Sequence, residues 1–552
     1  MPRIPAWIFA LILIVHIPAL FVDVMDIDAS QYAEMAREMR FSGNWTFLYD
    51  RGFAYLDKPP MLFWLSAASM ELFGPTNFGF KLPSFLVAIL AVYATYRLGR
   101  RLHGESVGRL AALVLASCQG MFLMTNDVRT DTMLMGWVAV AFWSWAEYRH
   151  NKKWGWLLLT AVGVAFGMMT KGPIALLAPV FAFGADALLR RDWKQIFDPK
   201  YIVAALVIAV LLIPMSIGLY QQFDADPAVF INGKTGASGL RFFYWSQSFG
   251  RITGESHWNN GAGPEFLLVN MLWAFLPWIL LFLLALGVGF RNLFRKKFRL
   301  GAGEEGVALG GFVLSYLALG MSRYQLPHYI FVVFPLAAIL VALLIKDFAE
   351  GKYPKWQRAF VKIQTGIGGL LLIVGVFLVL WMVFPARWYV FGAWAAAALI
   401  WVEIVRGTRG TGRIVWASAT AIVLTNIFLT NAFYRPLLLE YQLGSQAGRY
   451  IREKGIPREQ VLAYRVDDPL NSLPFYARSI IKRYQDSGYA AQRRFSYVLT
   501  GKEGLEEMAR EGIFPDTLAR FNRFKTSELT PTFLSAKSRP EAIAHYWLVR
   551  IR

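Results

Sequence analysis

The chain has 552 residues, of which 56% are hydrophobic and only 17% are charged. Repeated apolar runs of about 17 to 25 residues can each cross the hydrocarbon core of a bilayer, which excludes a purely soluble multidomain protein. The net charge of +20 would indicate nucleic-acid binding in a soluble chain. Here the basic residues lie in short loops between apolar runs, so they indicate membrane topology and attraction to lipid phosphate, and we expect no nucleic-acid partner.

The apolar runs, taken in chain order, predict an all-α polytopic membrane protein of about thirteen transmembrane helices. The first run, Ile4–Val24, is longer than a signal-peptide core and lacks a small-residue cleavage pattern, so we expect it to be retained. With the N-terminus inside, the basic loops fall on the inner side and the C-terminus lies outside. The other twelve predicted spans lie near residues 78–99, 108–125, 131–148, 154–169, 172–189, 200–220, 264–290, 304–320, 327–346, 361–384, 388–405 and 414–432.

The first outer loop, residues 25–77, is predicted to contain two helices that lie along the membrane. In residues 29–41, Tyr32 shares an apolar face with three other residues, while acidic and basic residues occupy the other faces. The segment Pro59–Phe73 has only about fifteen residues and contains Glu71, so it is short for a span. Counting it as a span would move every later loop to the opposite side and place the basic clusters outside, so we expect an interfacial or re-entrant helix here.

After the transmembrane domain, residues 1–432, the composition changes to that of a soluble tail. We predict that residues 433–552 form a small α/β or α+β domain on the outer side, and that residues 221–263 form a second long outer loop. The single Cys118 allows no intramolecular disulfide. The tail has strand-like runs at Gln460–Tyr464, Phe495–Leu499 and Tyr546–Ile551 and a helical run at Gly504–Arg510.

Ionisable residues at membrane level are costly, so those predicted at the outer side are candidates for function. A carboxylate there could act as a general base toward an acceptor hydroxyl, while Lys and Arg hold a phosphate leaving group. Each residue alone could equally be a solvated cap at a helix end. Two features favour function: Lys171-Gly172-Pro173 places a cation in a tight turn, and Asp57-Lys58-Pro59-Pro60 opens a helix whose free N–H groups can help bind an anion.

Four sequence segments resemble the bacterial ArnT/dolichyl-phosphate-mannose-protein mannosyltransferase-like family of GT-C glycosyltransferases. They are the run from Asp28 to Glu34, Tyr55-Leu-Asp-Lys-Pro-Pro60, Thr170-Lys-Gly-Pro173 and Leu326-Pro-His-Tyr329, which occur in order within residues 1–345. The resemblance implies transfer of a single sugar, with inversion, from a polyprenyl phosphate such as undecaprenyl phosphate. It also implies an active site on the outer face of a bacterial inner membrane.

The resemblance also implies roles for particular residues. Asp28 matches the catalytic acidic position and Asp131 a second functional acid, although Ala29 stands where many members carry Glu and an extra acid, Asp26, precedes Asp28. Some members bind a divalent metal, for which Asp57 and His257 are the candidates here. No nucleotide-binding glycine loop is present. The candidates for binding donor phosphate or substrate are Lys58, Tyr55, Tyr32, Arg129, Lys171 and His328.

Several functions stay open at this level. The acceptor could be a lipid A-like glycolipid, another envelope glycolipid or a protein Ser/Thr, as in protein O-mannosyltransferases. A transporter or flippase would line a path at mid-membrane depth with charged residues and could show inverted repeats, neither of which the sequence displays. A ligase or polymerase of preassembled glycans would differ in its donor, a lipid diphosphate oligosaccharide.

Overall fold

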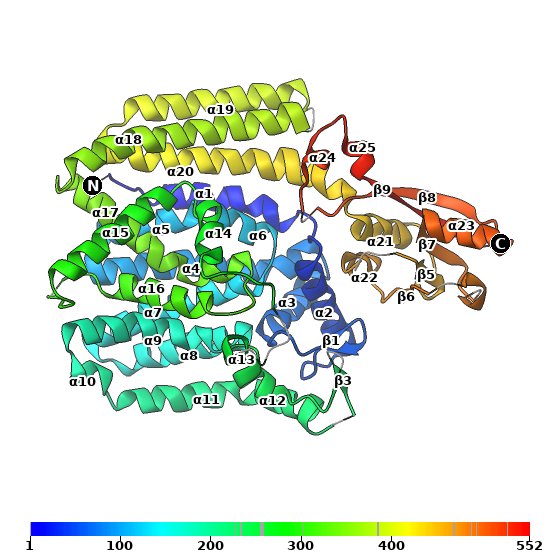
Figure 1. Ribbon diagram of the computed structural model, residues 1–552, viewed down its shortest axis with the longest axis horizontal. Helices are drawn as coiled ribbons and strands as arrows, with labels where there is room; N and C mark the ends of the chain where they lie inside the picture. Colours follow the sequence, from blue (N-terminus) through cyan, green and yellow to red (C-terminus); the bar gives the residue numbers. More distant parts are fainter. Residues whose placement is uncertain are drawn as a thin grey trace.

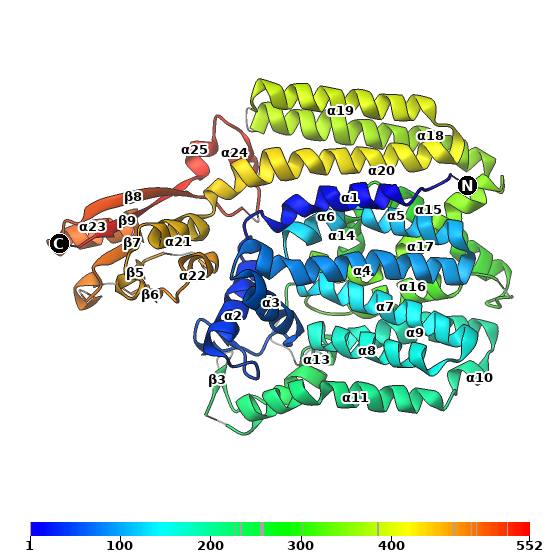
Figure 2. The same ribbon diagram turned by 180° about the vertical axis from the view of Figure 1, so that it is seen from behind.

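The computed structural model describes residues 2–226, 228–231, 234–253, 255, 259–301, 303–383, 386–466, 470–486, 488–492, 494–526 and 528–551. Long helices run roughly side by side in a bundle, and a smaller unit with a β-sheet projects from one end (Figures 1 and 2). The described N-terminal segment lies at the other end of the bundle, together with α10 (Trp193–Ile196). The first outer loop and the C-terminal region therefore share one end of the molecule, as the loop charges predict.

The bundle is built from apolar helices with a central and a peripheral layer. In the most apolar stretch of each segment, 89% of the residues are buried in Pro327–Ala349 but only 11% in α19, so η4 and α17 are central and α19 faces the surroundings. The bundle elements are α1 (Trp7–His16), η1 (Ile17–Leu20), α4 (Asn77–His103), α5 (Glu105–Ala116), α6 (Gln119–Asn126), α7 (Thr130–Asn151), α8 (Trp154–Lys171), α9 (Ile174–Arg190), α11 (Lys200–Leu219), α14 (Phe266–Ala274), α15 (Ile279–Arg295), α16 (Val307–Gly320), η4 (Pro327–Val333), α17 (Phe334–Ala349), α18 (Pro354–Gly369), η5 (Leu370–Val376), η6 (Val379–Val383), α19 (Trp388–Gly407), α20 (Gly410–Phe428) and η7 (Leu429–Leu438).

The chain is a multi-span membrane protein. Among the described residues, seven helices are long and apolar enough to cross a membrane, and there are eight if the pair α5 and α6, bent by 54°, is counted as one span. Residues 7–20, 61–73 and 307–320 form shorter apolar helices. Helical structure lies over each of the thirteen predicted segments. The number of thirteen crossings itself stays a prediction.

Small residues and one buried cation hold the central helices together. Gly136 of α7 lies against Val87 of α4, where an added Cβ would be 2.3 Å from the Val87 side chain. This is the close approach that small residues allow between membrane helices. The Lys81 ammonium group, buried in α4, donates hydrogen bonds to the carbonyl oxygens of Ala19 at 3.0 Å and Asn126 at 2.8 Å. It thereby ties the ends of η1 and α6 to α4.

The loops at the outer end form short elements beside the bundle (Figure 2). Both helices predicted in the first outer loop are present, as α2 (Asp28–Ser42) and α3 (Met61–Phe73). Two loop segments pair as β-hairpins. The further elements are β1 (Tyr49–Asp50), β2 (Phe53–Ala54), η2 (Tyr220–Asp224), β3 (Phe230–Ile231), β4 (Lys234–Thr235), α12 (Gly239–Arg241), η3 (Phe242–Ser246) and α13 (Phe249–Thr253).

The C-terminal region contains a five-stranded mixed sheet of order β6-β5-β7-β9-β8, in which β5 pairs in parallel with β6 and β7, and β9 is antiparallel to β7 and β8. The three strand-like runs predicted from the sequence coincide with β5, β7 and β9. The predicted boundary at residues 432 and 433 falls within η7, and the division into two domains stays a prediction. The elements are η8 (Leu439–Tyr441), α21 (Leu443–Glu453), η9 (Arg458–Gln460), β5 (Val461–Tyr464), α22 (Ser472–Ala477), β6 (Lys482–Tyr484), η10 (Tyr489–Gln492), β7 (Tyr497–Gly501), α23 (Lys502–Arg510), β8 (Asp516–Arg523), α24 (Pro531–Leu534), α25 (Arg539–Ala542) and β9 (Ala544–Arg550).

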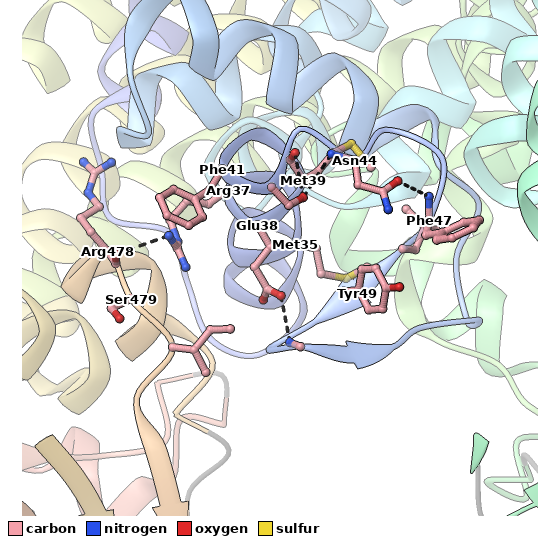
Figure 3. Close-up of a pocket in the computed structure, with 14 residues that line it drawn as sticks. Met35, Arg37, Glu38, Met39, Phe41, Asn44, Phe47, Tyr49, Arg478 and Ser479 are labelled. Atoms are coloured by element: carbon pink, nitrogen blue, oxygen red, sulfur yellow. Dashed lines mark hydrogen bonds between the residues drawn. The ribbon is translucent and has the colours of Figure 1, made fainter. Parts of the chain in front are cut away.

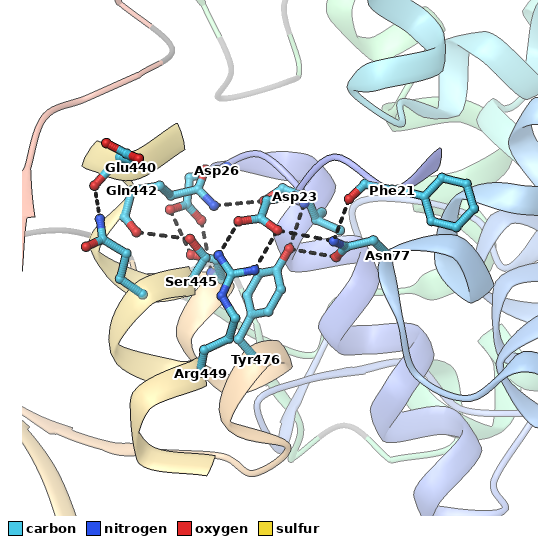
Figure 4. A network of polar contacts seen from close by, with 12 residues as sticks. Phe21, Asp23, Asp26, Asn77, Glu440, Gln442, Ser445, Arg449 and Tyr476 are labelled. Atoms are coloured by element: carbon cyan, nitrogen blue, oxygen red, sulfur yellow. Dashed lines mark hydrogen bonds and ion pairs between the residues drawn. The ribbon is translucent and has the colours of Figure 1, made fainter. Parts of the chain in front are cut away.

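A polar network joins the C-terminal region to the start of the first outer loop (Figure 4). Arg449 of α21 forms an ion pair with Asp23, with one contact of 2.7 Å between Nη1 and Oδ1. The Tyr476 hydroxyl accepts a hydrogen bond from the Val24 N–H at 2.8 Å and donates one to Asn77 at 2.7 Å. The C-terminal region is therefore anchored to the first residue of α4 and to the segment that leads into α2.

Candidate active site

Asp28 stands at the first position of α2, where a carboxylate is favourable beside the free N–H groups of the helix. Its side chain is 34% exposed and pairs with the Arg129 guanidinium, which precedes α7 and also bonds Asp127 at 2.8 Å. Burial lowers the pKa of Arg129, but Asp127 and Asp28 outweigh it and hold that pKa above its ordinary value. The guanidinium stays charged and fixes the orientation of Asp28, which keeps an accessible side.

Asp57 and Lys58 lie immediately before α3, because the following prolines fit the start of a helix. The Lys58 ammonium group is 2.5 Å from a carboxylate oxygen of Asp57. The side-chain amide of Gln247, from the second outer loop, donates a hydrogen bond to the Asp57 carbonyl. The two outer loops thus meet at the phosphate-site candidate.

Lys171 ends α8, and Gly172 follows with a φ of 112°, which is unfavourable for a residue with a Cβ. The chain can therefore turn directly after Lys171. The Lys171 ammonium pairs with Asp131, whose side chain is only 1% exposed, and lies 3.7 Å from the centre of the Tyr329 ring. His328 Nε2 is 3.5 Å from the other oxygen of Asp131. Three segments distant in sequence, which contain Asp131, Lys171 and His328-Tyr329, thus meet at one ammonium group.

Two tyrosines pack beside the charged side chains described above. Tyr32 of α2 and Tyr55 each pack edge-on against Phe63 of α3, with ring centres 5.7 and 6.2 Å apart. Burial, followed by the negative charges of Asp28 and Asp57, raises the pKa of Tyr32 well above its ordinary value. The phenol stays protonated at neutral pH and can donate a hydrogen bond to a bound substrate.

A cavity opens beside these groups and contains both lysines. Lys58 and Lys171 share it with Gln247, Ser248, Ser322 and Tyr329, and its other walls are apolar side chains of α9 and α16 together with Phe249. A wall of this composition suits a molecule with an anionic head and an apolar tail. Gln247 and Ser248 belong to no motif that the sequence singles out. The only signal for them in the sequence is the aromatic run that precedes them, Phe242 to Trp245.

The predicted site residues that the structure describes come together at the end of the bundle that carries the C-terminal region. We call Asp28, Asp57, Lys58, Asp127, Arg129, Asp131, Lys171 and His328 the charged cluster. The charges of Asp28, Asp57, Arg129 and Asp131 all act on the pKa of Tyr32, the three acids raising it and Arg129 lowering it. Their functional roles stay predictions.

Asp26, the extra acid, is directed elsewhere. Its carboxylate accepts hydrogen bonds from Ser30 Oγ at 2.7 Å and from the backbone N–H and hydroxyl of Ser472, both at 2.9 Å. Asp26 therefore links α2 to α22 of the C-terminal region, whereas Asp28 faces Arg129. The two acids are close in sequence but differ in surroundings.

The metal hypothesis finds little support in the described donors. His257 lies outside the described residues, and Asp57 contacts Lys58. Within the ranges that the structure describes, no group of three or more His, Cys, Asp or Glu residues could hold a metal ion. The described residues do not form a ligand set, so we derive no step through a metal, and metal dependence stays a prediction.

A second cavity lies against α2, between the first outer loop and the C-terminal region (Figure 3). The amphipathic pattern placed Glu34 and Arg37 on polar faces of α2, but both are buried. They form a two-pronged ion pair of 2.6 and 2.7 Å, and Arg37 also donates to the Arg478 carbonyl. The polar face is buried because the C-terminal region covers it.

Glu38 at this cavity should make stability depend on pH. Burial, then the charge of Glu34, raises its pKa from 4.5 to about 7. The protonated carboxyl group of Glu38 contributes its full stabilisation below pH 4.5, the ordinary pKa that it has in the unfolded chain. This contribution is lost as the pH rises through about 7, the pKa in the folded protein. The glutamine in Glu38→Gln cannot ionise. We therefore expect the difference in melting temperature, variant minus wild type, to increase by roughly 2 °C when the pH is raised from 5 to 8. Parallel thermal melts in detergent measure this, and an unchanged difference would contradict it.

Known proteins resemble the chain in sequence and in fold. Residues 57–217 match the family described as dolichyl-phosphate-mannose-protein mannosyltransferase. An undecaprenyl phosphate-alpha-4-amino-4-deoxy-L-arabinose arabinosyl transferase of Edwardsiella ictaluri is 26% identical over 452 residues, which cover 74% of this chain and 77% of that protein. A protein of the same name from Erwinia tasmaniensis is 28% identical, with 63% of this chain and 60% of that protein covered.

Among solved structures, ArnT of Cupriavidus metallidurans in the apo state superposes with a TM-score of 0.72 at 17% identity, covering 98% of this chain and 97% of that one. The same protein bound to undecaprenyl phosphate gives the same TM-score. An Archaeoglobus fulgidus oligosaccharyltransferase matches with a TM-score of 0.51 at 12% identity, covering 91% of this chain and 71% of that one.

The fold and the sequence matches together define a membrane glycosyltransferase of the GT-C type. Within that class the chain is a glycosyltransferase that uses a lipid-phosphate-linked sugar donor, and it is similar to ArnT and to the protein mannosyltransferases.

Proposed function

We propose that the enzyme transfers a single sugar from undecaprenyl phosphate to a lipid A-like glycolipid on the periplasmic face of the bacterial inner membrane. The observation that carries this proposal is the cavity in which Lys58 and Lys171 stand against apolar walls. A polyprenyl phosphate needs cations for its head and an apolar surface for its chain. The names of the sequence relatives favour 4-amino-4-deoxy-arabinose as the sugar.

The residues support an inverting displacement. Asp28 takes the proton of the acceptor O–H while the acceptor oxygen forms a bond to the anomeric carbon. On the opposite side, the bond from that carbon to the carrier phosphate oxygen breaks, and the phosphate leaves with its electron pair. Lys58 and Lys171 stabilise the departing charge. The burial of Asp131 and its pairing with Lys171 favour a positioning role for this acid over contact with the acceptor.

An assay with purified enzyme in lipid nanodiscs tests the proposal. We expect radiolabelled sugar to move from undecaprenyl phosphate to lipid A, and we expect no transfer from the corresponding nucleotide sugar. Transfer from the nucleotide sugar, or movement of labelled lipid across vesicle membranes without a new glycosidic bond, would overturn it. The second outcome would favour a flippase.

Protein O-mannosyl transfer is the second candidate, because the matching family is named for it. The same assay with undecaprenyl phosphate-linked mannose and a Ser/Thr-containing peptide distinguishes the two. Labelled peptide in place of labelled lipid would support the second candidate.

A further inference from the structure

A cavity rich in arginine lies between α2, the start of α4 and the C-terminal region, apart from the charged cluster. Its volume is about 660 Å³, enough for a small ligand. None of the described residues that line it is acidic. Six arginines line it: Arg37, Arg40, Arg449, Arg452, Arg458 and Arg478.

The positive charges are only partly neutralised by neighbouring acids. Arg37, Arg40, Arg449 and Arg452 have ion-pair partners, namely Glu34, Glu71, Asp23 and Glu453. Within the part of the chain that the structure describes, Arg458 and Arg478 form no ion pair. Burial, and then the charges of Arg452, Arg37 and Arg40, lower the pKa of Arg478 to about 10. The cavity thus holds several positive charges close together, and a bound anion would reduce the repulsion among them.

The surface beside the cavity carries exposed apolar side chains of α2 and α3. Phe41, which also lines the cavity, is 83% exposed, and Leu72 at the end of α3 is 80% exposed. The Phe78 ring stacks on Phe21 and meets Phe73 edge-on, with ring centres 5.6 and 5.2 Å apart. Exposed apolar patches mark sites of contact with membranes or with other proteins. In a membrane protein, this surface beside the cavity fits an anion that belongs to a lipid.

The cavity and the charged cluster are joined by one helix. Asp28 begins α2, and Arg37 and Arg40 lie near its end. Arg40 lies twelve positions after Asp28 along the helix, a rise of about 18 Å. Clustered arginines recognise phosphate through paired, charge-assisted hydrogen bonds. A head group anchored by phosphate in the cavity is thus held at a fixed place relative to Asp28.

We propose that this arginine cavity binds a phosphate group of the glycolipid acceptor and so positions the acceptor for transfer at Asp28. The ligand class is a lipid whose sugar head group carries phosphate. The assignment of this lipid as acceptor rests on the proposed function. The binding itself does not.

The test compares Arg452→Gln/Arg478→Gln with Arg358→Gln, an exposed arginine in α18 that does not line the cavity. Full-length enzyme in phosphatidylcholine nanodiscs is titrated with bisphosphorylated lipid A, with dephosphorylated lipid A and with phosphatidylglycerol. We expect the double variant to lose roughly tenfold in affinity for bisphosphorylated lipid A. The control variant should bind it as wild type does. Wild-type affinity for the dephosphorylated lipid should be as low as that of the double variant.

Turnover gives a second readout. The double variant should raise the KM for the acceptor roughly tenfold, with kcat and the KM for the donor unchanged. Its melting temperature should match or exceed that of wild type, because repulsion among the arginines is relieved. Equal binding of lipid A by wild type and double variant would overturn the proposal. Phosphatidylglycerol binding as tight as that of lipid A would overturn the assignment to the acceptor. If wild type transfers no sugar, the proposed function fails, while the binding titration still decides the cavity.

Discussion

Asp28→Asn is expected to lower kcat by about 10²- to 10⁴-fold, the range that a positioned general base contributes. The amide keeps the size of the carboxylate and can still accept a hydrogen bond from Arg129, so the local structure should survive. What it loses is the ability to take a proton from the acceptor. The measurement is initial-rate transfer of radiolabelled sugar, with the melting temperature as a check of folding.

Two nearby acids provide matched controls for Asp28. Asp127 pairs with the same Arg129, so Asp127→Asn removes a similar charge without removing the proposed base. We expect its kcat to stay within about tenfold of wild type. Asp26→Asn weakens the contacts to Ser472 and should lower stability more than kcat. If all three variants lost activity equally, Asp28 would act only as one charge among several.

The predictable part of the fold follows from charge and segment length. Rejecting Pro59–Phe73 as a span kept every basic loop on one side, and the structure forms a helix of 13 residues there, at the end of the bundle. The three strands found from the sequence are the central strands of the sheet, which carry apolar residues. The two that were missed, β6 and β8, are its edges. Edge strands are more polar and carry no apolar run to detect.

The candidate site was predictable where motifs are local and unpredictable where it depends on packing. Asp28 and Lys58 lie in recognisable segments, whereas Gln247 reaches Asp57 across 190 positions of the sequence. The burial of Glu34 and Arg37 could not be read from α2, because the C-terminal region that covers them is more than 400 residues away. Asp26 and Asp28 are the same residue type two positions apart, and only their tertiary partners separate their roles.

Lys58→Ala is expected to lower kcat by about 10²- to 10³-fold, which is the usual cost of removing one group that stabilises developing negative charge. Lys58 and Lys171 line the same cavity, but Lys171 is held by the buried Asp131 and the Tyr329 ring. Lys58, by contrast, pairs with Asp57, whose side chain is 30% exposed, so its ammonium can turn toward a phosphate at less cost. Binding of undecaprenyl phosphate should weaken in parallel.

Conservative replacement separates charge from geometry at this position. Lys58→Arg keeps the positive charge but presents a planar fork instead of a compact ammonium. We expect it to retain binding of undecaprenyl phosphate within about tenfold while losing more in kcat, because the leaving oxygen needs a cation at one place. Lys153→Ala, in the basic loop between α7 and α8, removes the same charge at the other end of the bundle and should leave both quantities unchanged. If Lys58→Ala turned over normally, Lys171 alone would hold the leaving phosphate, and the cavity would bind its donor in a different orientation.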